Sequence, residues 1–420
     1  MLSLEFLRKN PDAVKRAAQL KGEPAPVDDI LRLDEAWRGH LHKAETVKAE
    51  QNELSKEFAR TRDEALKDRL RQMADTAKSE LSVADAVKRE LDDLLMRVPN
   101  VFHESVPIGE TEADNVVTRD WGSKPELGFA PRTHYDLGEA LGIMDFEHAA
   151  RIAGSRFAFL IGDGARLERA LVQFMLDVHT REHGYVELWT PMLVNSASMT
   201  GTANLPKFAD QLFKIEDRDL WLIPTAEVPV TNFHREEILD GERLPLKYVS
   251  YAPSWRTEAG AAGKDTRGFI RMHQFSKVEL VKVTSAETSL EEFEKLTRDA
   301  EDILQRLGLH YQVMAMCSGD MGFAQYKKYD LNAWAPGLDR YLEVSSCSTF
   351  NDFQAMRANI RYRAGRGTPP RFAHTINGSG LALPRTIDAI METYQRADGM
   401  ITVPDVLKPY MGGVELIGAR

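Results

Sequence analysis

The chain has only two cysteines among its 420 residues, Cys317 and Cys347. Two thiols argue against a disulfide framework, and they supply no thiolate cluster for a structural zinc ion. Any bound metal would therefore be held by oxygen ligands.

The sequence also lacks an apolar run long enough to span a bilayer. Its first residues, MLSLEFLRKN, lack the basic start and apolar core of a secretory signal, so we expect a cytoplasmic protein with no membrane partner. With 43% hydrophobic and 28% charged residues, the composition is that of a globular protein of two or three domains. The net charge of −10 opposes non-specific attraction to a polyanion, so a nucleic acid would have to be bound by local basic surface and shape.

Neither G-x-x-x-x-G-K-[ST] nor G-x-G-x-x-G, the common phosphate-binding glycine motifs, occurs in the chain. If the chain uses ATP, the nucleotide must be held in another way.

A heptad pattern of apolar residues lies between Asp28 and Val98. It predicts two long helices with a turn near 60–67, folded as an antiparallel hairpin that projects about 45 Å. The ladders are Leu33, His40, Val47 and Leu54 with Trp37, Ala44, Gln51 and Phe58, then Leu70, Ala77, Ala84, Leu91 and Val98 with Met73, Glu80, Val87 and Leu94. A structural or oligomerising role is the plain interpretation of such a hairpin.

The distal end of this hairpin is locally basic. From Lys56 to Arg71 there are six basic and four acidic residues, an excess of +2 in an acidic protein. This end can contact phosphates, although charge runs on exposed helices are usually solvated faces.

Residues 99–130 are rich in Pro, Gly, Asp and Glu, as expected of a connecting segment. We therefore predict an N-terminal domain over 1–105 and a second domain over 106–420. In the second, helical periodicity at 165–183 and 288–307 accompanies strand-like runs at 186–194, 219–223, 246–251, 269–283 and 340–347. This pattern predicts an α+β fold, an antiparallel sheet flanked by helices.

The segment richest in chemistry runs from Ser254 to Val281. It contains a glycine-bearing loop, 258–268, between two predicted strands, and the second strand places Arg271, His273, Phe275, Lys277 and Glu279 on one face. Phe275 and Glu279 would lie about 13 Å apart, close to the span of an aminoacyl adenylate from base to amino acid. An aromatic ring can stack on adenine, an arginine can neutralise a phosphate and a carboxylate can hold an ammonium group. The alternative is a solvated strand face with incidental charges.

This segment resembles motif 2 of the class II aminoacyl-tRNA synthetases, in the form found in the seryl-tRNA synthetases. Residues 377–385, NGSGLALPR, followed by a helix through Tyr394, are similar to motif 3, and the helix at 165–183 leading to Thr190 and Pro191 resembles motif 1, the dimer interface. Thr225-Ala226-Glu227 and the segment 342–348, LEVSSCS, match further motifs of the family. The resemblance covers essentially the whole chain, including the hairpin.

The resemblance implies an enzyme that uses ATP and Mg²⁺ to form seryl-adenylate from L-serine and then transfers serine to the 3′ end of serine tRNA. The implied catalytic residues are Arg256, on the α-phosphate and the serine carboxylate, and Arg385, which forms a sandwich around adenine with Phe275. The implied ATP-binding residues are Arg256, Thr257, Glu258, Met272, Phe275, Glu343, Val344, Ser345, Ser346 and Arg385, and the serine-binding residues are Thr225, Ala226, Glu227, Arg256, Glu279 and Ser379. Glu343 and Ser346 would hold the metal.

The resemblance also implies a homodimer in which the hairpin reaches the long variable arm of tRNA. The implied tRNA contacts are Lys56, Arg60, Arg62, Lys67 and Arg69. Loading of selenocysteine tRNA with serine is expected as well.

Three expectations can be checked against geometry. Glu343 and Ser346 are three residues apart and would face opposite sides of a regular strand, so a bulge or strand end is required near Val344. Pro384 should be tolerated in the first turn of the motif 3 helix. His273 should have a structural role, because nothing in adenylate formation requires proton abstraction by that face.

Rival functions are a catalytically inactive synthetase-like module that binds RNA or protein, and a ligase that loads a carrier protein. The first would have lost its ATP-contacting groups, whereas Arg256, Glu258, Phe275, Glu343 and Arg385 are all present. The complete hairpin argues against the second.

Overall fold

The computed structural model describes residues 1–259 and 268–418. The eight central residues of the predicted motif 2 loop, 260–267, lie outside the described residues. The chain divides into two compact units, Met1–Val101 and Phe102–Arg420. No helix in the described part of the chain is both long enough and apolar enough to cross a membrane.

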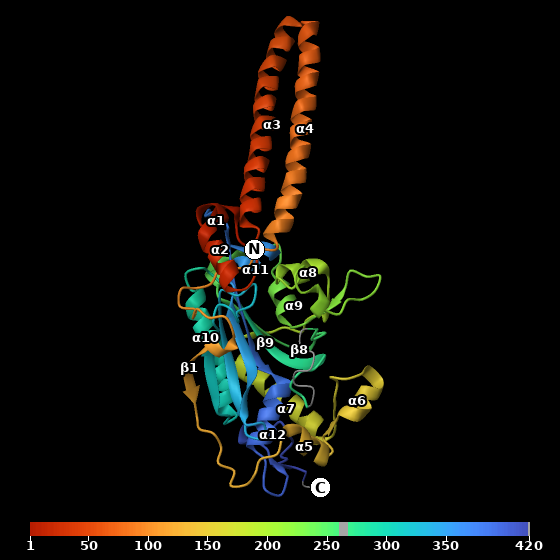
Figure 1. Cartoon of the computed structure of the whole chain (residues 1–420), viewed down its shortest axis with the longest axis vertical. Coiled ribbons are helices and arrows are strands. Elements are labelled where there is room, and N and C mark those ends of the chain that lie inside the picture. Colours follow the sequence, from red (N-terminus) through yellow and green to blue (C-terminus); the bar gives the residue numbers. More distant parts are fainter. Residues whose placement is uncertain (260–267, 419–420) are drawn as a thin grey trace. The chain divides into compact units, whose positions relative to one another are not determined.

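The first unit consists of four helices. Two short ones, α1 (Leu4–Lys9) and α2 (Pro11–Leu20), pack near the start of α3 (Val27–Thr61), which runs antiparallel to α4 (Glu64–Leu95) (Figure 1). We call the α3–α4 hairpin the arm. At 1.5 Å per residue, the 35 residues of α3 span about 50 Å, close to the predicted length.

The arm turns at Arg62 and Asp63, inside the predicted interval. Arg62 has the positive φ of a left-handed C-cap, and the Asp63 carboxylate caps α4 by accepting the Ala65 N–H. The fourth helix ends at Leu95, so the prediction that Val98 belongs to it is wrong. Pro99 disfavours helical backbone at the residue before it, which accounts for the early end.

Two polar residues at heptad positions of the arm have partners inside it. His40 Nδ1 lies 2.6 Å from Glu80 Oε2, and Gln51 Nε2 donates to the Leu70 carbonyl at 3.3 Å. These pairs join the two helices at defined heights, so they favour a single register.

The second unit is built on an eight-stranded sheet. All neighbours are antiparallel except β4 and β8 at one edge, which are parallel. In spatial order the strands are β1 (Val116–Trp121), β10 (Tyr311–Ala315), β11 (Lys327–Ala335), β12 (Arg340–Thr349), β15 (His374–Ala382), β9 (Gln274–Thr284), β8 (Leu246–Trp255) and β4 (Val186–Glu187). The α+β prediction is confirmed.

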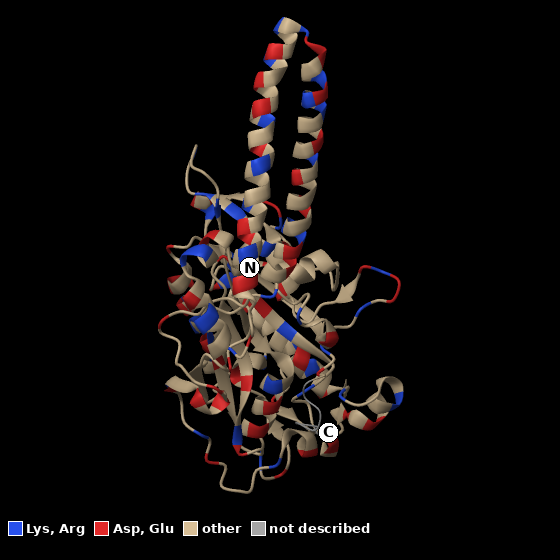
Figure 2. Cartoon of the chain, turned by 45° about the horizontal axis from the view of Figure 1, so that its top comes forward, with Lys and Arg blue, Asp and Glu red and all other residues tan. Residues whose placement is uncertain are grey.

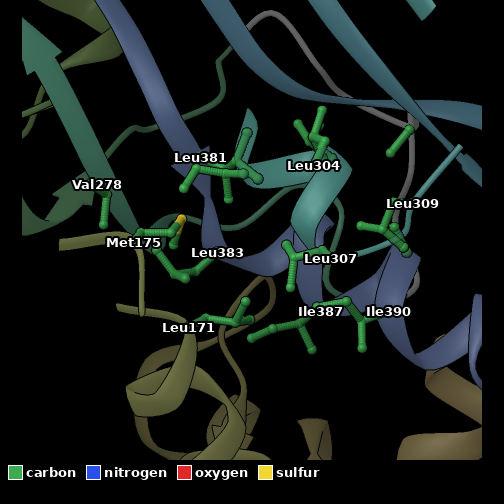
Figure 3. Close-up of a cluster of buried hydrophobic side chains, with 14 of the residues drawn as sticks. Leu171, Met175, Val278, Leu304, Leu307, Leu309, Leu381, Leu383, Ile387 and Ile390 are labelled. Carbon is green, nitrogen blue, oxygen red and sulfur yellow. The ribbon is translucent and has the colours of Figure 1, made fainter. Parts of the chain in front are cut away.

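Helices α7 (Asp163–Arg181), α10 (Ser289–Arg306) and α12 (Leu383–Thr393) pack on this sheet. Each has an apolar stripe, which in α7 includes Leu167, Leu171 and Val178, all buried. Figure 3 shows Leu171 and Met175 of α7 in the same cluster as Ile387 and Ile390 of α12. The predicted helices at 165–183 and 288–307 are confirmed within two residues, as is the place of Pro384 in the first turn of α12.

Shorter elements surround this core. The helices are α5 (His134–Ala140), α6 (Phe146–Ala153), α8 (Ser196–Gly201), α9 (Glu227–Asn232), α11 (Phe353–Ala358) and the 3₁₀ turns Glu112–Asp114, Ala209–Gln211, Gly241–Arg243 and Asp405–Leu407. The strands are β2 (Met144–Asp145) with β3 (Phe159–Leu160), β5 (Leu193–Val194) with β6 (Trp221–Leu222), β14 (Arg371–Phe372) with β13 (Arg361–Arg363) and β7 (Ile238–Asp240), and β16 (Ile401–Thr402) with β17 (Leu416–Ile417).

One predicted connection and two predicted strands need correction. The segment at 99–130 is not only a connection, because Val116–Trp121 forms the edge strand β1 on β10. The run at 186–194 is two short strands, since Pro191 between them has no N–H to donate. The predicted strand from 269 begins only at Gln274, opposite Trp255 where β8 ends, so residues 269–273 have no partner strand.

Candidate functional site

A cavity of about 370 Å³ opens in the second unit, over the strands β9, β12 and β15 and the start of α12. It is lined by Thr225, Glu227, Arg256, Glu258, Phe269, Ile270, Arg271, Met272, Phe275, Lys277, Gln325, Lys328, Glu343, Val344, Ser345, Ser346, Ser348, Asn377, Ser379, Ala382, Pro384 and Arg385. Most of the predicted ATP-binding and serine-binding residues therefore come together, from segments more than 150 residues apart.

Both predicted catalytic arginines line this cavity. Arg256 follows β8 and donates from Nε to the Pro224 carbonyl at 3.2 Å, and its guanidinium lies 5.1 Å from the centre of the Phe275 ring. Arg385 donates from Nε to the Ile270 carbonyl and from Nη1 to the Glu343 carbonyl, at 3.1 and 2.8 Å. Backbone acceptors thus fix two cations at the wall, as recognition of phosphate requires.

Beside them, Glu258 and Arg271 form an ion pair at 3.3 Å. Arg271 reaches the cavity from the bend before β9, not from a strand as predicted. His273 does not line the cavity. Its Nδ1 lies 3.0 Å from the Arg256 carbonyl and its ring packs against Phe157 and Phe213, which agrees with the predicted structural role.

The bulge required near Val344 is present. Along the β11–β12 ladder Leu331 pairs with Ser345 but Asn332 pairs with Glu343, so Val344 is the extra residue. Glu343 and Ser346 consequently both line the cavity, although they are three residues apart. The Glu343 side chain is 45% exposed, and the positive charges of Arg385 and Lys328 outweigh its partial desolvation, so its pKa lies below the usual value. An ionised carboxylate and a hydroxyl on one wall are oxygen ligands that suit magnesium.

The predicted serine-binding end is a buried polar cluster. Thr225 Oγ1 accepts the Glu227 N–H at 3.2 Å and donates to Glu279 Oε2 at 3.1 Å, and Asn377 Nδ2 donates to Glu279 Oε1 at 3.1 Å. Lys277 forms a short ion pair with Glu279. Burial, and then the charge of Glu279, raise the pKa of Glu227 to about 7.

Three predicted site residues do not reach the cavity wall. Glu279 is fully buried behind Thr225, Lys277 and Asn377, so it acts on the cavity through these neighbours. The Ala226 side chain is packed in a separate apolar cluster. The Thr257 hydroxyl donates to the Asp210 carbonyl instead.

Among the polar wall residues, the sequence predicts no role for Gln325, Lys328, Ser348 and Asn377. Asn377 is in the motif 3 segment, two residues before Ser379, and residues two apart on a strand point to the same face. Its place on the wall could therefore be predicted from that of Ser379. No local sequence pattern predicts that Lys328 and Gln325 line the cavity. Strand pairing brings Lys328 opposite Ser348 on β12, and only the sheet places it there.

The predicted tRNA-binding residues lie at the distal end of the arm, along which basic and acidic residues alternate with others (Figure 2). Lys56, Arg60 and Arg69 line one open groove between the helices, together with Glu50, Glu53 and Glu57. Arg62 is in the turn, and Lys67 is paired with Glu64 at 3.3 Å.

Comparison with known proteins gives the family. A model described as the seryl-tRNA synthetase N-terminal domain matches residues 1–102, and one described as the tRNA synthetase class II core domain (G, H, P, S and T) matches residues 212–394. A serine–tRNA ligase of Caldanaerobacter subterraneus is 52% identical over 416 residues, 98% of each chain. The chain belongs to the seryl-tRNA synthetases.

Further relatives and solved structures support this assignment. The serine–tRNA ligase of Pelotomaculum thermopropionicum is 50% identical over the full length of both chains. The crystal structure of the seryl-tRNA synthetase of Pyrococcus horikoshii, complexed with ATP, superposes with a TM-score of 0.95 at 38% identity and covers 99% of each chain. A prolyl-tRNA synthetase of Giardia lamblia, at 15% identity and a TM-score of 0.57, shares the fold over 66% of this chain. The family predicted from the motifs is confirmed.

Proposed function

We propose that this seryl-tRNA synthetase activates L-serine with ATP as seryl-adenylate and transfers the seryl group to the 3′ end of serine tRNA. The observation that carries the proposal is one cavity whose wall combines the cations of Arg256 and Arg385, the aromatic ring of Phe275 and the polar groups of Thr225 and Glu227. The ATP complex of the Pyrococcus relative supports ATP as the nucleotide.

In the first step a serine carboxylate oxygen attacks the α-phosphorus of ATP, and the bond from that phosphorus to the bridging oxygen of pyrophosphate breaks. Arg256 and Arg385 both line the cavity, where Arg256 would hold the α-phosphate and the serine carboxylate and Arg385 would stabilise charge on the phosphates. In the second step a hydroxyl of the terminal adenosine attacks the seryl carbonyl and AMP leaves. Neither step needs a protein nucleophile, so catalysis consists of positioning and charge stabilisation.

The adenine is proposed to stack between Phe275 and Arg385, with Glu258 on its amino group and Met272 at the wall. In the structure it is Arg256 that lies over the Phe275 ring, so this sandwich requires the adenine to enter on the Arg385 side. Thr257 and Ser345 would contribute through the backbone, because their hydroxyls bond to the Asp210 and Ser379 carbonyls.

Glu343 and Ser346 would hold Mg²⁺, which neutralises phosphate charge when bound. The bulge at Val344 supports this, since it brings both oxygen ligands to the cavity. Few protein ligands plus substrate phosphates are the usual environment of magnesium.

Serine is proposed to be read by Thr225, Glu227 and Ser379, with Glu279 behind them. A buried site that hydrogen-bonds the serine hydroxyl leaves its own groups unpaired when alanine or glycine binds, and such a loss discriminates by about 10⁴-fold or more. Threonine would be excluded by its extra methyl group.

The arm is proposed to bind the long variable arm of serine tRNA through Lys56, Arg60, Arg62, Lys67 and Arg69, mostly by shape and backbone contacts. On this proposal the N-terminal domain, 1–105, binds tRNA, and 106–420 is catalytic.

We also propose that the protein forms a homodimer. Apolar residues next to α7 support it, because Val186 and Trp189 are 58% and 87% exposed in the single chain. Charging of selenocysteine tRNA and a cytoplasmic location also belong to the proposal.

The deciding experiment is amino-acid-dependent exchange of pyrophosphate into ATP with each of the twenty amino acids. Exchange with serine alone is expected. Exchange with threonine alone would overturn the specificity, and exchange with no amino acid would favour the inactive module.

A further inference from the structure

A buried chain of hydrogen bonds runs behind Glu227, away from the cavity. Gln354 Nε2, on α11, donates to Glu227 Oε1 at 2.7 Å, and Thr375 Oγ1, on β15, donates to Gln354 Oε1 at 2.6 Å. Gln354 and Thr375 are each 1% exposed and neither lines the cavity. We call these two residues the relay.

The relay has a fixed direction. An ionised carboxylate only accepts hydrogen bonds, so the amide nitrogen of Gln354 must face Glu227 and the amide oxygen must face Thr375. The Thr375 hydroxyl satisfies that oxygen. Without it, the amide can turn and present its oxygen to the carboxylate, which is repulsive.

The charge state of Glu227 depends on its neighbours. The charges of Glu279 and Lys277, on β9, and of Arg256, after β8, act on it, and the Gln354 amide donates a hydrogen bond to it. Burial and Glu279 raise its pKa to about 7, whereas the Gln354 amide opposes the rise. A protonated Glu227 has lost the charge that attracts an ammonium group, so the relay favours the form that binds an amino acid.

We propose that Gln354 and Thr375 are positioning residues for the amino acid: they hold Glu227 in the orientation and ionised state that receive the polar groups of serine. The inference rests on the proposed function, because it assumes that Glu227 contacts serine.

The test compares single variants in serine-dependent pyrophosphate exchange as a function of pH. Thr375→Val removes the hydroxyl at nearly constant volume, Thr375→Ser keeps it, and Gln354→Met removes the amide at similar length. Thr349→Val is the matched control, since Thr349 is fully buried on the neighbouring strand β12 and its hydroxyl has no hydrogen-bond partner among the described residues.

For Thr375→Val and Gln354→Met we expect the KM for serine to rise about tenfold, with kcat at saturating serine within about twofold and the KM for ATP unchanged. The acid limb of kcat/KM should move up by about one pH unit. Thr375→Ser and Thr349→Val should match the unaltered chain.

A Thr375→Val variant that behaves like Thr349→Val would overturn the relay. The relay would also be overturned if the KM values for serine and ATP rose equally and the acid limb of kcat/KM did not move. That result would show a purely structural role. Absence of serine-dependent exchange in the unaltered chain would instead overturn the proposed function.

Discussion

At the scale of single residues, two carboxylates lie at the end of the cavity that we assign to serine, Glu227 at the wall and Glu279 buried behind Thr225. Glu279 is fully buried and paired with Lys277, while Glu227 has a pKa raised to about 7 by burial and by Glu279. Charge repulsion is relieved when an ammonium group arrives, so serine binding and ionisation of Glu227 should be coupled.

The sign of this coupling gives a pH prediction. Because the pKa of Glu227 in the folded chain lies above the usual 4.5, ionising it lowers the folding stability as pH rises from 4.5 to about 7. Serine binding requires the ionised form, so kcat/KM for serine should fall about tenfold per pH unit below pH 7 and level off above it. Pyrophosphate exchange between about pH 5 and about pH 8 measures this fall, the acid limb of the kcat/KM profile.

Glu227→Gln is the control for that limb. The variant should bind serine more weakly at every pH and lose the dependence near pH 7. A limb that persists unchanged in Glu227→Gln would assign it to another group.

At the scale of elements, the predicted tRNA-binding residues lie on two long helices, α3 and α4, and in the turn that joins them. Arg60 and Arg69 share a groove, and Arg62 is held in the turn between α3 and α4. Such side chains contribute to RNA binding mainly through phosphates, in a salt-dependent way.

Reversing Arg60, Arg62 and Arg69 to Glu should therefore weaken tRNA charging while sparing adenylate formation. We expect kcat/KM for tRNA to fall at least about tenfold and its dependence on salt to become shallower. Aminoacylation and pyrophosphate exchange, measured on the same preparation, separate the two steps. Equal loss in both assays would contradict the assignment of the arm.

Elements with strong local periodicity could be predicted from the sequence. The arm and α7 have repeating apolar positions, and even the bulge at Val344 follows from the spacing of Glu343 and Ser346 once both are required on one face. The edge strand β1 could not be predicted, because Val116 and Val117 are exposed and a Pro- and Gly-rich segment surrounds them.

The relay and much of the cavity wall depend on long-range pairing. Gln354 meets Glu227 across more than 120 residues and is itself held by Thr375, and Lys328 reaches the wall only through the order of strands in the sheet. No local pattern marks these residues, so the sequence alone does not predict their place at the site.

At the scale of the whole molecule, the chain consists of two compact units, and each has a buried interior of its own. The cavity and all the residues that line it belong to the second unit. Adenylate formation should therefore need only that unit.

A chain truncated to residues 102–420 should form seryl-adenylate within about threefold of the full-length rate and charge tRNA roughly hundredfold less efficiently. Pyrophosphate exchange and aminoacylation measure the two activities, and circular dichroism checks that the fragment is folded. A folded fragment without exchange would show that the first unit contributes to the chemistry.

Because the arm is built from seven-residue repeats, its length can change by whole repeats. Each seven-residue repeat added to both helices lengthens a hairpin by about 10 Å, and the polar pairs His40–Glu80 and Gln51–Leu70 would keep the existing repeats aligned. An insertion of two repeats near the turn would lengthen the arm without changing a residue of the cavity. On the proposal that the arm binds tRNA, its reach can therefore change by whole helical repeats while the catalytic residues stay the same.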